Sequence, residues 1–341
     1  QGLDSDAEYV IRVAGYGRSL LKADGHRLEP FVDNRGFGEF KEFRVPAELL
    51  QDRRLTITWD RPTDEGHLNW RQQSRNAEIW LLRQDAVSST EASNLLPPPK
   101  SGDRYVVAHR GAHQGIPENT LAAYRKAIEL SADFVEIDLR TTKDGQFVSI
   151  HNRTVDAYVT DGTQAAVQDL TLAELKALDI GSRVDPRWKQ ERVPTFDEIL
   201  RLCKNRIGIY LDLKDAPVDQ VAAVIQQYGM QRQVIGGVSP QVVPAIRRSC
   251  PDCIPMPDPE SEDTLPQMLQ ETQARIVAPV WSDFSSTFSA PCHQAGILVF
   301  VDEQKSDADN WQQALDWGAD GIQTDDPAGL IAFLRQRAGQ E

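Results

Sequence analysis

From residue 105 onward, strand patterns alternate with helix patterns, and this alternation restricts the fold more than any other feature of the sequence. Eight short runs rich in Val, Ile and Leu are separated by stretches with apolar residues at helical spacing. Eight such units in about 235 residues favour a closed (β/α)₈ barrel, a TIM barrel, with an open doubly wound sheet as the alternative. In both folds the functional residues lie at the carboxyl ends of the strands.

The strands are predicted at Tyr105–His109, Phe134–Leu139 with a paired Phe147–His151, Ile207–Leu213, Val234–Gly237, Cys253–Met256, Ile276–Val280, Ile297–Val301 and Gly321–Thr324. The helices between them are predicted at Thr120–Ser131, Leu172–Leu178, Phe196–Cys203, Val218–Tyr228, Gln241–Arg248, Leu265–Glu271, Ala308–Trp317 and Ala328–Arg337. The barrel domain is therefore expected to occupy residues 104–341.

The first part of the chain has a different pattern. Residues 8–85 read as short strands separated by glycine-rich turns, with a single helical turn expected at Pro46–Gln51. The clearest strands are Tyr9–Val13, Phe40–Val45, Leu55–Trp59 and Glu78–Leu82. A small all-β sandwich is predicted for residues 1–87, and residues 88–103, with three consecutive prolines, are predicted to be a semi-rigid linker.

The charge distribution limits the partners. The chain has a net charge of −14, with 13 basic and 16 acidic residues before the proline run and 24 and 35 after it. Nucleic acids and anionic membrane surfaces attract basic surfaces, so neither is an expected partner. An anionic substrate would need a local cation. No apolar run is long enough to span a membrane. The oligomeric state is left open.

The chain begins with Gln1 in place of an initiator Met, which fits a removed signal peptide or a trimmed sequence. We expect a secreted or periplasmic protein. The four cysteines are too few for a disulfide framework. Cys250 and Cys253 have the CxxC spacing of redox and zinc motifs, but without a second CxxC pair a local disulfide or two ordinary thiols is the favoured interpretation.

One predicted strand carries two carboxylates on one face. Alternation along the strand places Glu136 and Asp138 together, and Val135, Ile137 and Leu139 on the opposite face. Neighbouring carboxylates inside a protein repel each other and lose hydration unless a proton or a cation lies between them. The alternative is a solvent-exposed edge strand, but the apolar face favours an interior strand and hence a metal site.

Other polar side chains follow neighbouring strands. His109 and Arg110 end the first strand, and His151 ends the hairpin partner of the second. Asp212 and Lys214 repeat the two-residue spacing on the third strand. Because these positions share one end of the sheet, the sequence predicts a single site with three carboxylates, two histidines and two permanent cations.

Seven motifs follow one another in the barrel part, namely His109-Arg110-Gly111, Pro117-Glu118-Asn119-Thr120, Glu136-Ile137-Asp138, Thr142-Lys143-Asp144-Gly145, His151-Asn152, Asp212-Leu213-Lys214 and Gln323-Thr324-Asp325-Asp326-Pro327. In this order they resemble the glycerophosphodiester phosphodiesterase family, across nearly all of residues 104–337. The resemblance implies metal-dependent hydrolysis of a glycerophosphodiester to glycerol 3-phosphate and an alcohol, by attack of a glycerol hydroxyl or of water.

The residue chemistry agrees with that activity. Oxygen ligands from the metal set, Glu136, Asp138 and Asp212, suit Mg²⁺ or Ca²⁺. Imidazoles titrate near neutrality, so His109 and His151 are expected to be the general acid and base.

Two cations are expected to hold the phosphate, Arg110 through its planar fork and Lys214 as a point charge. Gly111 is expected to leave room for the substrate. Glu118, Asn119 and Asn152 are expected to orient these groups, with Asn119 or Thr120 also capping the next helix. His113 is left out of the site because only Ala112 and Gln114 flank it.

Three positions differ from the family pattern. Asn152 stands where aspartate is usual, Asp212 where glutamate is usual, and Val299-Phe300-Val301-Asp302 where a tryptophan-threonine-valine-asparagine run is frequent. These changes alter the surroundings of His151, the reach of one carboxylate and the wall of the pocket. The alcohol released, and even the substrate class, is therefore left open.

The first domain resembles galactose-binding-like β-sandwiches of secreted polysaccharide-degrading enzymes, on the basis of tryptophans and arginines along its strands. Trp59, Trp70 and Trp80 would stack on sugar rings or fill the sandwich core. The substrate is expected to be a small-molecule or glycan-linked phosphodiester. Alternatives are a phospholipase D-like cyclising lyase, a glycan-directed enzyme with the same site, and a weakened binding protein.

Overall fold

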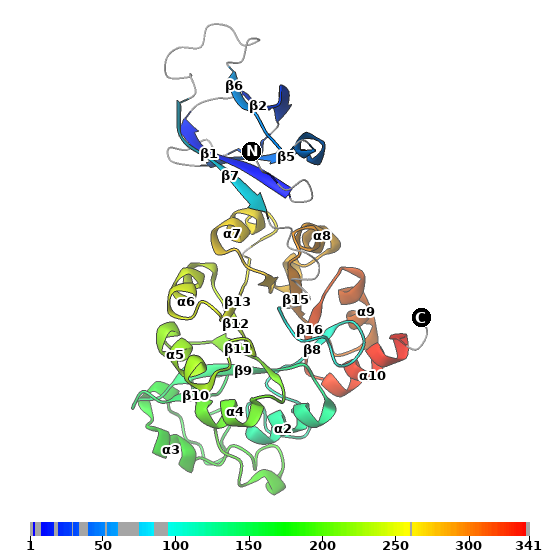
Figure 1. Ribbon diagram of the computed structural model, residues 1–341. Helices are drawn as coiled ribbons and strands as arrows, with labels where there is room; N and C mark the ends of the chain where they lie inside the picture. Colours follow the sequence, from blue (N-terminus) through cyan, green and yellow to red (C-terminus); the bar gives the residue numbers. More distant parts are fainter. Residues whose placement is uncertain are drawn as a thin grey trace. The chain divides into compact units, whose positions relative to one another are not determined.

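The computed structural model describes residues 3, 8–16, 20–28, 30–33, 40–51, 53–60, 75–84, 95–259 and 261–338. The chain divides into two compact units, residues 1–88 and 89–341 (Figure 1). We describe each unit by itself. Within the described residues, none of the helices combines the length and the apolar character that crossing a membrane requires.

The described residues of the first unit form two small antiparallel sheets. One sheet has the order β4-β5-β1-β7 and the other β3-β2-β6. Their strands are β1 (Glu8–Tyr16), β2 (Leu20–Ala23), β3 (His26–Leu28), β4 (Pro30–Asp33), β5 (Phe40–Val45), β6 (Ile57–Asp60) and β7 (Arg75–Gln84). Alternate residues of β1 and β5, such as Ile11 and Phe43, share one buried core with Leu21 of the second sheet. The predicted all-β sandwich is thereby confirmed as a fold class.

The sequence indicated β1, β5, β6, β7 and the helical turn, which is a short 3₁₀ segment at Ala47–Leu50. It did not indicate β2, β3 and β4, which are only three or four residues long. Trp70 lies outside the described residues, as do the side chains of Trp59 and Trp80. The expectation that these tryptophans contact a sugar stays a prediction.

The second unit is a nearly closed barrel of eight parallel strands, as predicted. Its order is β13-β12-β11-β9-β8-β16-β15-β14, and β10 pairs antiparallel with β9. The strands are β8 (Tyr105–Ala108), β9 (Phe134–Thr141), β10 (Phe147–Ser149), β11 (Gly208–Leu213), β12 (Val234–Val238), β13 (Ile254–Pro257), β14 (Ile276–Val277), β15 (Leu298–Asp302) and β16 (Gly321–Thr324). Between the outermost strands, the amide of Ala278 donates to the carbonyl oxygen of Pro257 at 3.2 Å.

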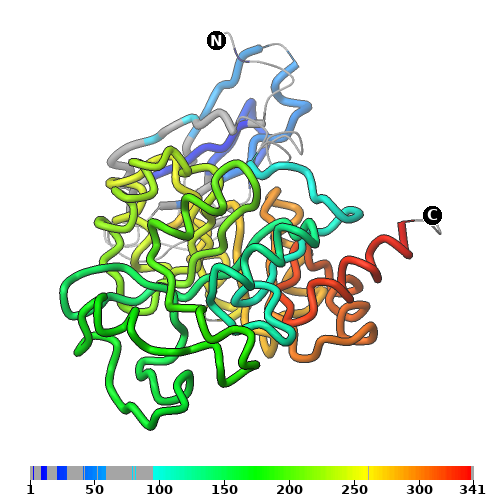
Figure 2. Tube along the Cα trace, turned by 90° about the horizontal axis from the view of Figure 1, so that it is seen from below, coloured from blue at the N-terminus to red at the C-terminus, as the bar shows by residue number. Residues whose placement is uncertain are grey.

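Helices surround the barrel strands, and the red C-terminal segment returns beside the cyan segment that begins the barrel (Figure 2). The helices are α2 (Leu121–Leu130), α3 (Leu172–Ala177), α4 (Phe196–Cys203), α5 (Val218–Tyr228), α6 (Val243–Ser249), α7 (Leu265–Thr272), α8 (Ser286–Gln294), α9 (Ala308–Asp316) and α10 (Pro327–Ala338). The sequence prediction omitted α8. This helix contains Pro291 and many small polar residues, so it has a weak apolar stripe.

Apolar side chains fill the barrel interior at the amino-terminal ends of the strands. Phe134 of β9 meets Phe300 of β15 at a centroid distance of 6.0 Å, and Tyr105 stacks on Phe300 at 5.5 Å. Because inward residues on a strand recur every second position, Glu136 and Asp138 follow Phe134 along the same inner face. The outward residues of β9 pack beneath the helices. The two carboxylates therefore lie next to a layer of apolar side chains, on the side nearer the carboxyl ends of the strands.

Residues 95–103, the second half of the stretch assigned to a linker, lie against the barrel. Leu96 is buried in the same apolar cluster as Phe134. The ammonium of Lys100 donates to the carbonyl oxygen of Ala132 at 2.6 Å, and the Tyr105 hydroxyl donates to the carbonyl oxygen of Pro97 at 2.9 Å. This segment therefore belongs to the barrel unit.

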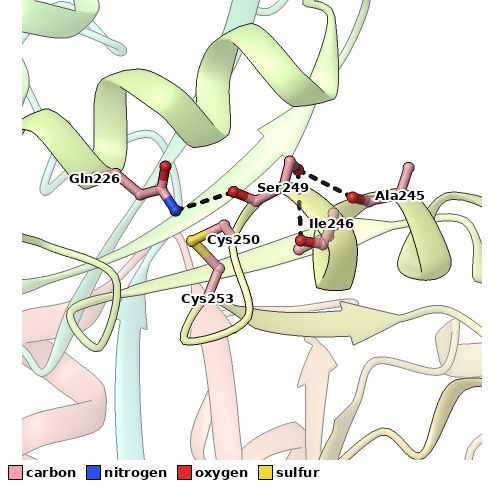
Figure 3. Close-up of a disulfide and its surroundings, with 6 residues drawn as sticks. All are labelled: Gln226, Ala245, Ile246, Ser249, Cys250 and Cys253. Atoms are coloured by element: carbon pink, nitrogen blue, oxygen red, sulfur yellow. Dashed lines mark hydrogen bonds between the residues drawn. A yellow bond between two sulfur atoms is a disulfide. The ribbon is translucent and has the colours of Figure 1, made fainter.

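Cys250 and Cys253 form a disulfide, one of the two arrangements favoured by the sequence (Figure 3). It joins the end of α6 to the residue before β13, with the two Cα atoms 5.3 Å apart. The side chain of Gln226 on α5 donates to the Ser249 carbonyl oxygen at 2.9 Å beside it. Neither cysteine is a candidate catalytic residue, so the disulfide is a structural link between α6 and β13.

Candidate active site

Three carboxylates converge at the carboxyl ends of β9 and β11. Asp138 and Asp212 are opposite each other in the parallel pairing of these strands. Glu136 is 2% exposed and Asp138 1%. One oxygen from each of Glu136, Asp138 and Asp212 can be chosen so that all three lie within 4.8 Å of one another. The structure thus brings the predicted metal set together.

Two cationic side chains lie against these acids. The Lys214 ammonium is 2.6 Å from Asp212 Oδ2 and 3.1 Å from Asp138 Oδ1. The backbone amide of Arg110 donates to Glu136 Oε2 at 2.8 Å, and its Nε is 3.6 Å from Asp138 Oδ2. Nε of Arg110 is buried and makes no hydrogen bond within the described part of the chain. It remains a donor for an incoming anion.

The donor set fits a hard divalent cation. Burial raises the pKa of Glu136, and the nearby charge of Asp138 raises it further, so this carboxylate tends to hold a proton without a cation. All three candidate ligands offer oxygen, the donor that Mg²⁺ and Ca²⁺ prefer. A cation would replace that proton and offset the repulsion among three acids that Lys214 offsets in part.

The turn after β8 places Arg110. Arg110 and Gly111 both have left-handed φ values, 52° and 83°. A Cβ atom at Gly111 would lie 2.7 Å from the Cβ of Ala123 and 2.9 Å from its carbonyl carbon. Gly111 was expected to make room for the substrate. This expectation is wrong, because the hydrogen at this position makes room for helix α2.

The Pro-Glu-Asn-Thr loop contacts both charged groups. Glu118 Oε1 accepts from Arg110 Nη1 at 3.0 Å, and the side-chain amide of Asn119 donates to Asp138 Oδ2 at 2.8 Å. The Thr120 hydroxyl, rather than Asn119, caps α2 by accepting from the Ala123 amide. Glu118 and Asn119 therefore contact the residues they were expected to orient.

A buried hydroxyl pair fixes Asn119 in turn. The hydroxyls of Tyr124 and Ser149 donate to Asn119 Oδ1 at 2.9 and 2.8 Å. With the amide oxygen occupied by two donors, the amide nitrogen must point to Asp138. The sequence gave no sign of this arrangement, because it joins a helix and two strands through side chains far apart in the chain.

His109 meets a carboxylate that follows β16. Its Nδ1 is 2.7 Å from Asp325 Oδ1. Burial lowers the pKa of His109, but the hydrogen bond to Asp325 and the charges of Glu136 and Asp302 together raise it to about 9. The same contact, with a second one from His113, holds the pKa of Asp325 far below its usual range. His109 is therefore an imidazolium at neutral pH.

His113 also belongs to this group, although the sequence analysis left it out. Its Nε2 is 3.0 Å from the same oxygen, Asp325 Oδ1. The signal that could have found it is the sequence motif of Asp325, which lies directly after a barrel strand and so at the same rim as the loop after β8.

His151 lies beyond β10, in a connection with its own apolar core. The amide of Ile150 donates to the Asp138 carbonyl oxygen at 3.0 Å, so His151 directly follows the residue that is bonded to Asp138 of β9. His151 Nδ1 is 3.0 Å from Asn152 Oδ1. The backbone amide of Asn152 donates to the Tyr158 hydroxyl at 3.0 Å. Asn152 thus contacts the histidine through a neutral oxygen.

Sequence comparison agrees with this geometry. Residues 109–242 match the glycerophosphoryl diester phosphodiesterase family. A glycerophosphodiester phosphodiesterase of Caldanaerobacter subterraneus is 29% identical over 252 residues, which cover 68% of this chain and 98% of that protein. Human glycerophosphodiester phosphodiesterase 1 is 32% identical over 183 residues, which cover 51% of this chain and 55% of that protein.

Solved structures agree on the fold. The glycerophosphodiester phosphodiesterase of Agrobacterium tumefaciens is 26% identical, with a TM-score of 0.59, covering 67% of this chain and 99% of that one. An Oleispira antarctica phosphodiesterase, solved with its product sn-glycerol-3-phosphate, has a TM-score of 0.61 at 22% identity, covering 73% of this chain and 99% of that one. Residues 109–242 are therefore a domain of the glycerophosphoryl diester phosphodiesterase family, and the chain is an enzyme of this phosphodiesterase class.

Proposed function

We propose that this chain hydrolyses glycerophosphodiesters to glycerol 3-phosphate and an alcohol, in a reaction that depends on a divalent cation. The observation that carries the proposal is the meeting of Glu136, Asp138 and Asp212 with Arg110 and Lys214 at one barrel end. The names of the relatives supply the substrate class.

Phosphate binding follows from the two cations. The unpaired Nε–H of Arg110 and the ammonium of Lys214 each face a carboxylate that they would share with a phosphate oxygen. A cation held by Glu136, Asp138 and Asp212 would supply charge neutralisation for the phosphate and for the transition state. Lys214, which lies against Asp138 and Asp212, would hold a phosphate oxygen.

The two histidines differ in their partners, and this difference supports separate roles for them. Asp325 accepts from Nδ1 of His109 and keeps the ring protonated, so Nε2 carries a proton for the leaving alcohol oxygen. Asn152 offers His151 a neutral amide oxygen, which accepts from Nδ1 and leaves Nε2 with its lone pair. His109 is thus the general acid and His151 the general base, which takes the proton of the attacking hydroxyl or water.

The remaining parts of the proposal concern the location of the protein, its partners and its first unit. The Cys250–Cys253 disulfide is typical of oxidising compartments, so it supports a secreted or periplasmic location. The acidic balance of the chain supports the absence of a nucleic-acid partner. A role of residues 1–88 in presenting a glycan-linked or surface-bound substrate is part of the same proposal.

The test is phosphorus NMR of glycerophosphocholine incubated with metal-stripped enzyme, with and without Mg²⁺ or Ca²⁺. We expect glycerol 3-phosphate only when the cation is restored. Accumulation of a cyclic phosphate would instead identify a cyclising lyase. If a panel of glycerophosphodiesters gave neither product with either cation, the proposal would be overturned.

A further inference from the structure

His109, His113 and Asp325 form a second cluster of possible metal ligands at the rim of the site. One atom of each residue can be chosen so that all three lie within 4.8 Å of one another. Both rings approach the same oxygen, Asp325 Oδ1, at 2.7 and 3.0 Å. The side chain of Asp325 is 57% exposed, so an ion can reach the cluster from solvent.

Both sides of the cluster are held in place by other contacts. The loop that carries His113 closes with a hydrogen bond from the Ile116 amide to the His113 carbonyl oxygen at 3.1 Å, and the indole of Trp188 donates to the Gly115 carbonyl oxygen at 2.8 Å. Glu303 Oε1 accepts from the Asp325 amide at 3.0 Å. The ligand atoms are therefore brought together before any ion binds.

The surroundings favour positive charge at this point. Besides Asp325, the carboxylate of Asp302 acts on His109 in the same sense, and the charge of Arg110 acts in the opposite sense. Because a carboxylate oxygen only accepts, the two ring nitrogens that face Asp325 Oδ1 can bond to it only through protons that they carry. A divalent cation would satisfy the preference for positive charge equally well, by displacing those protons and binding the ring nitrogens directly.

The donor atoms select a different class of ion from the carboxylate set. Two imidazole nitrogens and one carboxylate oxygen suit zinc and similar transition metals, whereas three carboxylates suit Mg²⁺ and Ca²⁺. Zinc bonds of about 2.0–2.1 Å in a tetrahedral arrangement separate ligand atoms by roughly 3.3 Å. Each ring nitrogen would therefore have to move away from Asp325 Oδ1 by only about half an ångström or less.

We propose that His109, His113 and Asp325 form an inhibitory site for Zn²⁺ or a similar transition-metal ion, separate from the site of the catalytic cation. Binding displaces the proton from Nδ1 of His109 and leaves the proton on Nε2. Loss of that remaining proton would produce a metal-bound imidazolate, so the ring is a much weaker acid than the imidazolium and protonation of the leaving alcohol is suppressed. The inhibitory effect rests on the proposed function, whereas the binding itself does not.

The first test measures binding without reference to activity. Zn²⁺ is titrated calorimetrically into the full chain in the presence of saturating Mg²⁺, which keeps the carboxylate set occupied. We expect one zinc site in the wild type and an affinity at least tenfold weaker in His113→Ala. If His113→Ala does not fold, as judged by circular dichroism, His113→Gln takes its place.

His293→Ala is the matched control. His293 Nε2 is 2.9 Å from Asp320 Oδ2, so this pair has the same chemistry but lies on α8 and before β16. Its loss should leave zinc binding unchanged. Equal zinc affinity in the wild type and in the His113 variant would overturn the proposal.

The second test measures zinc inhibition of glycerophosphodiester hydrolysis in excess Mg²⁺. Each protein is compared with its own zinc-free rate, and the inhibition constant for zinc should be at least tenfold higher in the His113 variant than in the wild type. Equal inhibition of both proteins would place zinc at the carboxylates and overturn the proposal. If the wild type shows no hydrolysis, the proposed function fails, and the calorimetric result still decides whether the zinc site exists.

Discussion

Replacing Asp325 by Asn should move the alkaline limit of the reaction to lower pH. In the wild type, burial lowers the pKa of His109, and the 2.7 Å contact with Asp325 together with nearby charges raises it to about 9. Asn keeps a hydrogen-bond acceptor of similar size but removes the charge. The proton needed by the leaving alcohol is then lost at lower pH.

The size of the shift follows from the charge that is removed. A close opposite charge changes a pKa by about 1–3 units, so the alkaline limb of the profile should move to lower pH by about that amount in the variant. On that limb the rate follows the protonated fraction of His109, so kcat/KM should fall by about tenfold or more there, whereas well below the limb it should stay unchanged.

The assay is the pH dependence of kcat/KM for a glycerophosphodiester, compared between wild type and variant at saturating Mg²⁺. Asp320→Asn is the control, because it removes the charge from the other described pair of this kind, His293 with Asp320. That variant should keep the wild-type profile. An Asp325→Asn profile with an unmoved alkaline limb would refute the assignment of His109 as the general acid.

Three further outcomes are expected. His109→Ala and His151→Ala should each lose at least about 100-fold in rate, the usual contribution of a general acid or base, and near-full activity in either would require another assignment. Replacing Cys250 and Cys253 by Ser should lower the unfolding free energy by up to about 2 kcal/mol, since the bridge closes a short loop, with hydrolysis unchanged; a loss of turnover in the folded variant would contradict this. Deleting residues 1–88 should preserve turnover of a small soluble phosphodiester and reduce turnover of a surface-bound one, and equal losses on both would argue against a role in substrate presentation.

Local sequence signals account for the parts of the fold that were predicted well. Helices α4 and α5 begin and end at the predicted residues. Thr195 and Glu198 form a capping box at the start of α4, and Gly229 takes the left-handed conformation that ends α5. Helix α8 was missed because Pro291 interrupts an already weak apolar pattern.

The site was predictable where it depends on strand position alone. Glu136, Asp138 and Asp212 face inward at adjacent strand ends, as the two-residue repeat requires. The contacts of His109 with Asp325 depend instead on the conformations of two loops that are 216 residues apart. No local pattern carries that information, so the fold had to be known first.

The most direct test of the central claim is calorimetric titration of Mg²⁺ and Ca²⁺ into the metal-stripped enzyme, its Asp138→Asn variant and the control Asp309→Asn. Asp138 lies within the carboxylate set at 1% exposure, whereas Asp309 is an exposed residue of α9. We predict one site in the wild type and in Asp309→Asn, with affinity at least tenfold weaker in Asp138→Asn and hydrolysis weakened in parallel. Unchanged affinity in a folded Asp138→Asn variant would contradict the assignment of the metal centre.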